Sequence, residues 1–477
     1  MKWNAFNLLL SLCFWPHDAA RAATSTNAAN PTKATSAASV TNAANPAQLV
    51  YNSKTTLDAY NSVGRKDPKW DADARKCLSA YAQLCSWTND VPTELIQEVR
   101  TNLARAMTLG CDDPFMRYLH FRFEDPDIGD ASAYRAVASD LQQSKYPDIR
   151  KFYATMLAED AYLSAAPRRS ELAVILGAAT SFLGKALDDP TIPLKEADDA
   201  CNLLMTRTTD ADPKPWRRYQ ILEPGLTNRW KGTTMSLLAK GRGLISYAWQ
   251  ARGSGFADTV SETGWKLMDE RMNLAADTLE SAWKADPHDA RICVEMLWVE
   301  LAQNRGRDRM ELWFQRGMKI DPGNRELCNA KLEYLRPRWH GGLKEMIAFG
   351  RECTVKTNVG CRLHLMLSDA HFEASREIMD DTERAAYWKK PNVWPDIQFT
   401  FEKFFELHPE EVGYRHNYAR YATWCSQWPE FLKQVKLFPD TNYAYFGGLE
   451  KFNGLVKTAE EQVKKQPRSD PHLDAAW

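Results

Sequence analysis

The spacing of apolar residues constrains this chain more than any other feature. From Leu57 onward they recur every three or four positions almost throughout, which places them on one face of an α-helix. Clear segments include "DADARKCLSAYAQLCSW" and "ELAVILGAATSFLGKALDD", and short breaks with Asp, Pro, Gly or Asn separate them. Runs of alternating β-branched residues are scarce, which argues against a sheet. The sequence therefore predicts an all-α protein.

A weak repeat runs through the second half of the chain. Pro287 and Pro322 are thirty-five residues apart, close to the 34-residue period of tetratricopeptide (TPR) repeats. At matching offsets before the two prolines stand Ala275, Leu279 and Ala282, and Met310, Phe314 and Gly317. A third copy before Pro409 has Phe404 where a small residue belongs. The pattern predicts a degenerate TPR-like solenoid of helical hairpins.

The N-terminus has the features of a secretory leader. Lys2 precedes a short apolar run, and Ala20-Arg21-Ala22 fits a small-x-small cleavage site. We expect a signal peptide over residues 1–22 and export to the periplasm or the medium, although a leader-like start on a cytosolic protein is the alternative. Residues 23–48 contain little but Ala, Ser, Thr, Asn and Pro, which is typical of a disordered linker.

The remaining chain is expected to have three parts. A Pro-rich stretch, "DADPKPWRRYQILEPG", separates an N-terminal helical region, residues 49–224, from the TPR-like domain at residues 225–440. Residues 441–477 form a C-terminal helix and tail. No segment after the leader has the length and purity of a transmembrane helix.

Overall charge argues against partners recognised by bulk electrostatics. Lys plus Arg number 61 against 62 Asp plus Glu, for a net charge of -1. Because the charges nearly cancel, we do not expect net charge to drive binding to nucleic acid or to an anionic membrane. The 17 tryptophans are many and require either a structural use or a contact surface.

Ten cysteines become nine if the leader is removed. We expect Cys77 to pair with Cys111 across two antiparallel helices, and Cys353 to pair with Cys361 across a turn. Neither spacing is Cys-x-x-Cys, so no metal site is predicted.

Several segments together resemble the bacterial family known as domain of unknown function 4034. The resemblance rests on "YAWQARGSGFADTV" at 247–260, "GW" at 264–265, "DPHDA" at 286–290, "DP" at 321–322 and "LRPRWHGG" at 335–342. It covers about a quarter of the chain firmly and about two thirds loosely. It implies a TPR-like helical fold in exported bacterial proteins and implies no activity.

Residues 249–265, "WQARGSGFADTVSETGW", join two predicted helices. Their glycines do not form a nucleotide loop, because a helix precedes them and no Gly-Lys-Ser/Thr follows. Gly253 fits a helix C-cap, and Thr259 with Glu262 has capping-box spacing. Arg252 is placed to pair with an acidic residue of the same segment. We interpret the segment as scaffold first, with a binding role left open.

Other chemistry-bearing residues do not assemble into a catalytic set. His364 and His371 stand two helical turns apart, too far for joint metal ligation, and packing explains them better. Adjacent carboxylates recur, but such pairs also suit helix N-termini. In "GYRHNYARYATWCSQW", the tyrosines form a core stripe, which would leave Arg415, His416 and Arg420 solvated.

The sequence thus favours a non-enzymatic, exported protein that binds a protein or peptide and needs no cofactor or metal. The weak candidates for contact with this partner are Arg252, Asp258, Arg336, Arg338 and Trp339, which come from the segments that carry the resemblance. The alternative is a carbohydrate-active enzyme on an α-helical toroid, with a tryptophan-lined cleft and two catalytic carboxylates.

Overall fold

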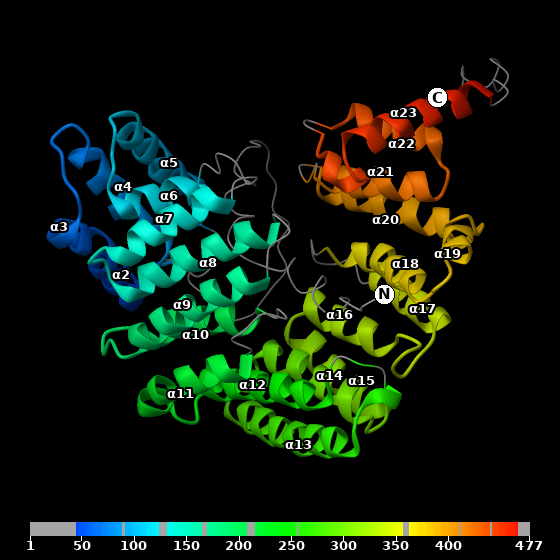
Figure 1. Ribbon diagram of the computed structural model, residues 1–477, viewed down its shortest axis with the longest axis horizontal. Coiled ribbons are helices and arrows are strands. Elements are labelled where there is room, and N and C mark those ends of the chain that lie inside the picture. The colour runs from blue at the N-terminus through cyan, green and yellow to red at the C-terminus, as the bar shows by residue number, and fades with distance from the viewer. Residues whose placement is uncertain are drawn as a thin grey trace, which may run out of the picture. The chain divides into compact units, whose positions relative to one another are not determined.

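The computed structural model describes residues 44–465, apart from 88–90, 124–130, 165–168, 208–214, 254, 256, 356–361, 410, 412 and 439–440. Within these residues the secondary structure is helical and contains no strand (Figure 1). An isolated bridge joins Ala44 to Trp87. The all-α prediction is confirmed. The predicted signal peptide, residues 1–22, lies outside the described residues.

The first described helix begins before the expected end of the linker. Helix α2 (Pro46–Ser53) begins inside its last residues, so the prediction that the linker extends to residue 48 is wrong. The Asn45 side chain accepts the backbone N–H groups of Ala47 and Gln48, and Pro46 occupies the first helical position. Both features stabilise a helix N-terminus.

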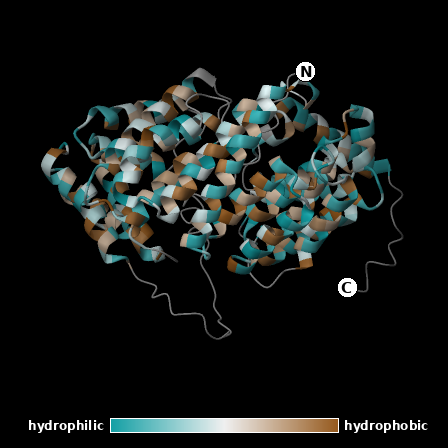
Figure 2. Cartoon of the chain, turned by 90° about the horizontal axis from the view of Figure 1, so that it is seen from below, coloured by the Kyte–Doolittle hydropathy of each residue, from teal (hydrophilic) through white to brown (hydrophobic). Residues whose placement is uncertain are grey.

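The helices are amphipathic. Figure 2 shows hydrophobic and hydrophilic residues interspersed along them, as expected for helices that bury one face. Among the described residues, no helix combines the length and the apolar character needed to cross a membrane.

The chain divides into two compact units, Met1–Pro287 and His288–Trp477. The sequence placed a boundary between residues 224 and 225, but that position lies inside helix α11 (Pro215–Trp230), which continues through Pro224. Leu222 and Leu226 on either side of this proline are fully buried. Burial of apolar side chains offsets the hydrogen bond that a proline removes from a helix, so the helix is not interrupted there.

In the first unit, helices pack mainly on their neighbours in the sequence. One apolar cluster lies among the helices from α3 to α8, and a second among those from α8 to α12. The remaining elements of this unit are a π-helical segment η1 (Lys54–Asp58), α3 (Ala59–Val63), α4 (Asp71–Leu84), α5 (Thr93–Thr108), α6 (Pro114–Phe123), α7 (Ala131–Gln143), α8 (Asp148–Ser164), α9 (Arg169–Leu187), α10 (Leu194–Met205), α12 (Thr234–Arg252), the 3-10 turn η2 (Ala257–Thr259) and α13 (Glu262–Ala285).

A buried arginine fixes the N-terminal segment to the body of the first unit. Arg150 on α8 is 1% exposed and donates to Asn52 Oδ1 and Thr55 Oγ1, each at 2.6 Å. Glu196 on α10 is also buried and accepts a hydrogen bond from Gln48 at 2.9 Å. Because buried charges must be paired and hydrogen-bonded, this network requires the chain from α2 to η1 to be in place.

The second unit also consists of helices that pack on near neighbours. An apolar cluster that includes Phe431, Phe446 and Phe452 lies near its C-terminus. Its elements are α14 (Ala290–Gln303), α15 (Arg307–Ile320), α16 (Arg325–Tyr334), α17 (Leu343–Val355), η3 (Arg362–Leu365), α18 (Met366–Arg376), α19 (Asp381–Trp388), α20 (Val393–Leu407), α21 (Tyr414–Trp424), α22 (Trp428–Lys436), η4 (Tyr443–Phe446) and α23 (Leu449–Lys465).

The two helices that carry the weak repeat end in the same way. Extended residues Asp286 and Asp321 follow α13 and α15. Each donates its backbone N–H, at 2.9 Å, to the carbonyl of the small residue four positions earlier, Ala282 or Gly317. A Cβ on Gly317 would lie 2.4 Å from a methyl of Leu327. The small residue therefore stands where a neighbouring helix comes close.

Candidate functional site

Segment 249–265 connects α12 to α13. At its start, Gly253 has φ +76° and ψ −177°. A positive φ at this position favours glycine, as the sequence indicated, but this ψ lies outside the left-handed helical region. Its N–H donates to the carbonyl of Trp249 at 3.0 Å and closes the last turn of α12. The glycine thus ends the helix and turns the chain.

The start of α13 differs from the prediction. Ser261 is the capping residue, and its hydroxyl accepts the N–H of Gly264 at 3.0 Å. The capping box expected from Thr259 and Glu262 is wrong, because Glu262 is already the first helical residue. Serine in this position satisfies a backbone donor that the helix itself leaves unpaired.

Arg252 is the centre of the connection. Its guanidinium carbon lies 5.7 Å from the ring centroid of Trp249 and 5.4 Å from that of Trp265, within cation–π range of both. Its Nη1 donates to the carbonyl oxygens of Gly253 at 3.2 Å and Gly255 at 2.9 Å. The side chain therefore joins the end of α12, the connection and the start of α13.

No carboxylate among the described residues forms an ion pair with Arg252. The expected pairing with Asp258 or Glu262 is absent, and both acids are exposed. The Nε of Arg252 is buried and has no hydrogen-bond acceptor among the residues that the structure describes, and burial lowers the pKa of the guanidinium. Trp265 beside it is 40% exposed. A part-buried cation thus lies next to an exposed aromatic ring.

Arg336 lies in a different environment. It is 2% exposed, and its Nη1 lies 2.8 Å from Glu333 and 2.9 Å from Glu373. Its Nη2 lies 2.6 Å from Glu377. Burial alone would lower the pKa of Arg336, but the three carboxylates outweigh it and raise that pKa. The expectation that Arg336 is available at the surface is therefore wrong. Three acids enclose it: Glu333 in α16, Glu373 in α18, and Glu377, which directly follows α18.

Arg338 and Trp339 belong to the same network. Arg338 Nη2 lies 2.5 Å from Glu377, and the Trp339 indole N–H donates to Glu333 at 3.1 Å. Both side chains are partly exposed. The structure thus brings Arg336, Arg338 and Trp339 together, in the second unit, while Arg252 and Asp258 belong to the first.

The cysteines with expected partners are free thiols where they are described. Cys77 and Cys111 are buried in one apolar cluster, and burial raises the pKa of Cys111 to about 11. Their pairing stays a prediction. Cys361 lies outside the described residues, so its pairing with Cys353 also stays a prediction. Cys353 Sγ is 4.0 Å from Cys328 Sγ, a neighbour that sequence spacing did not indicate.

Sequence reasoning missed a polar chain that crosses four helices of the second unit. His371 is buried, and its Nδ1 lies 2.8 Å from the Tyr387 hydroxyl and its Nε2 2.9 Å from Asp396. Arg351 donates to Asp396 at 2.7 Å. With its proton on Nε2, the His371 ring donates to Asp396 and accepts the Tyr387 hydroxyl at Nδ1. This order of groups is that of a proton relay, but it equally completes the hydrogen bonds of buried side chains, in agreement with a packing role for His371.

The aromatic segment near the C-terminus is partly as expected. Tyr418 and Tyr421 are buried. His416 was expected in solvent but is buried, stacked on Phe438 with centroids 4.1 Å apart, and it accepts the N–H of Asn442. That expectation is wrong, because the chain after α22 returns to cover this face of α21.

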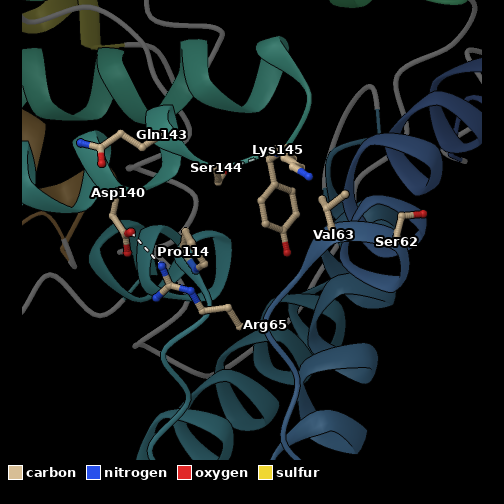
Figure 3. Close-up of a pocket in the computed structure, with 9 residues that line it drawn as sticks. Ser62, Val63, Arg65, Pro114, Asp140, Gln143, Ser144 and Lys145 are labelled. Atoms are coloured by element: carbon tan, nitrogen blue, oxygen red, sulfur yellow. Dashed lines mark hydrogen bonds and ion pairs between the residues drawn. The ribbon is translucent and has the colours of Figure 1, made fainter.

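A pocket of about 580 Å³ opens in the first unit (Figure 3). Arg65 lies in its wall, 3.1 Å from Asp140 and 3.5 Å from Asp112. The lining residues are Ser62, Val63, Arg65, Pro114, Asp140, Gln143, Ser144, Lys145 and Tyr146. Asp140 and Asp112 therefore already balance the charge of Arg65 in this pocket.

Comparisons with known proteins do not assign the chain. No protein-family model matches it, and no curated protein matches it significantly. Membership in the domain of unknown function 4034 family therefore stays a prediction, which rests on the segments quoted from the sequence.

Proposed function

We propose that this chain is an exported, non-enzymatic helical-repeat protein whose TPR-like hairpins bind a protein or peptide, and that Trp249, Arg252 and Trp265 contact that partner. Two features support the repeat: helices pack mainly on sequence neighbours, and α13 and α15 end with the same cap geometry. Stacked hairpins leave a continuous surface on which a partner binds.

The observation that carries the proposal is the state of Arg252. Among the residues that the structure describes, no acid balances its charge, and its Nε has no acceptor. A carboxylate of a partner that packs beside the exposed ring of Trp265 would balance this charge, because it accepts charge-assisted hydrogen bonds from the accessible side of a guanidinium. Tryptophan and arginine are also the residues that contribute most often to binding energy at protein interfaces.

Affinity capture tests the proposal. The protein without its leader is used as bait on an envelope extract of its source cells, and recovered proteins are identified by mass spectrometry. We expect a reproducible partner whose recovery falls at least about tenfold with Arg252→Ala and with Trp265→Ala, the loss typical of a residue central to an interface.

Arg229→Ala is the matched control. Arg229 also stacks on a tryptophan, Trp230 at 4.8 Å, and also donates to a backbone carbonyl. This variant should recover the partner as the wild type does. If Arg252→Ala lowers the melting temperature and leaves recovery unchanged, the cluster is scaffold only. Recovery of oligosaccharide in a Trp265-dependent manner would favour the carbohydrate-active alternative instead.

A further inference from the structure

Two thiols of the second unit lie in contact. Cys328 is on α16 and Cys353 is in the last turn of α17, and their sulfur atoms are 4.0 Å apart. Cys328 is fully buried and Cys353 is 3% exposed. Helices α16 and α17 pack against each other, so the two side chains approach from facing elements.

We propose that Cys328 and Cys353 are the site of an internal disulfide that joins α16 to α17. A disulfide needs a sulfur separation of about 2.05 Å, and a change of side-chain torsion supplies most of the difference from contact distance when backbones already pack together. This pairing and the one expected between Cys353 and Cys361 exclude each other, because Cys353 can form only one disulfide.

The chemistry is thiol–disulfide exchange with a disulfide oxidant such as oxidised glutathione. One thiolate attacks the oxidant, forms a mixed disulfide and releases one reduced glutathione. The second cysteine, as its thiolate, attacks the protein sulfur of that mixed disulfide and releases the other. Two protein thiols are oxidised, one oxidant disulfide is reduced to two glutathione thiols, and the two protons pass from the protein thiols to the released glutathione thiolates. Because both thiols are buried, we expect the exchange during folding, before this core closes.

The bond would close a loop that contains Arg336, Arg338 and Trp339. It would hold the α16–α17 hairpin together independently of the ion pairs of Arg336 with Glu373 and Glu377. The inference does not depend on the proposed partner binding, because its test detects a covalent bond within the chain.

Trypsin separates the relevant cysteines, which makes the test direct. Cys328, Cys353 and Cys361 fall on three different peptides, "ELCNAK", "ECTVK" and "TNVGCR". The wild-type protein is refolded with reduced and oxidised glutathione, alkylated in denaturant and digested without reduction. We expect "ELCNAK" joined to "ECTVK". Recovery of both peptides fully alkylated, or of "ECTVK" joined to "TNVGCR", overturns the proposal.

Stability provides a second readout. The oxidised protein should melt about 5–10 °C above the reduced protein, since the bond constrains a loop of moderate length in the unfolded chain. All variants carry Cys77→Ser, which removes the other disulfide expected from the sequence, and in this background Cys328→Ser should abolish the difference. Cys201→Ser, which removes a buried thiol of the first unit, should leave it unchanged. An oxidation-dependent shift that persists when Cys328→Ser is combined with Cys77→Ser contradicts the proposal.

Discussion

At the scale of single residues, Gly350 shows where the backbones of two helices lie close together. A Cβ at this position of α17 would lie 2.9 Å from Ala370 Cβ and 3.0 Å from the backbone Cα of Leu367 on α18. No rotamer change relieves a clash with backbone, and overpacking costs about 1–3 kcal/mol, more than the ~1 kcal/mol that alanine gains in helix propensity. We expect Gly350→Ala to lower the free energy of unfolding, measured by urea denaturation.

Gly454 provides the control for this prediction. It lies in α23, and a Cβ there would have no heavy atom within 4 Å. Gly454→Ala should raise the free energy of unfolding by up to about 1 kcal/mol, because only the propensity acts. Stabilisation by both substitutions would show that α17 and α18 separate without cost.

Single residues also differ in how far their environment could be predicted from the sequence. Gly317 was predictable as a close approach, because it repeats the position of Ala282 in the pattern. The burial of Arg336 was not predictable, since Glu373 and Glu377 that neutralise it come from another helix and no local spacing records them. Arginine is usually exposed, and only the tertiary structure supplies its partners.

At the scale of elements, the polar chain through Asp396 joins α17, α18, α19 and α20. Burial alone would raise the pKa of Asp396, but hydrogen bonds from His371 and Arg351 outweigh it and hold that pKa below its ordinary value. A carboxyl with a depressed pKa stabilises the fold above its unfolded pKa and loses this contribution as pH falls through the folded value. The loss is therefore expected below about pH 4.

Replacement of this carboxylate tests the contribution. Asp396→Asn should lower the free energy of unfolding at pH 7 by about 1–3 kcal/mol, as expected when hydrogen bonds to a charged group are weakened. It should also reduce the difference between pH 7 and pH 3. Asp381→Asn is the control, because that side chain is 89% exposed and an exposed pair with Arg384 contributes under about 1 kcal/mol. Equal effects of the two substitutions would contradict the prediction.

The existence of the elements was predictable, but their ends and their grouping were not. "ELAVILGAATSFLGKALDD" covers most of α9, because apolar spacing records the buried face. The start of α13 was misplaced, since both Thr259 and Ser261 are chemically able to cap it and only the backbone path selects Ser261. Pro224 suggested a boundary, yet burial of the neighbouring leucines keeps α11 continuous.

At the scale of the whole molecule, the boundary between the two compact units, after Pro287, has a testable consequence. A fragment of residues 44–287 keeps the apolar cluster of α8 to α12 complete. A fragment that stops at residue 224 loses Leu226, Trp230 and Met235, which are buried in that cluster with Leu183. Each such side chain contributes about 1.5–3 kcal/mol by burial, and a domain has a total stability of only about 5–15 kcal/mol.

We therefore expect fragment 44–287 to unfold in a cooperative thermal transition followed by circular dichroism at 222 nm, and fragment 44–224 to lack one. Residues 288–477 should likewise give a cooperative transition by themselves, because they form a compact unit of their own. A cooperative transition in fragment 44–224 would mean that α4 to α10 are stable without α12, and would restore the boundary that the Pro-rich stretch indicated. A failure of fragment 44–287 alone would mean that α13 depends on packing by residues beyond Pro287, as in a solenoid whose repeats stabilise one another only in an unbroken series.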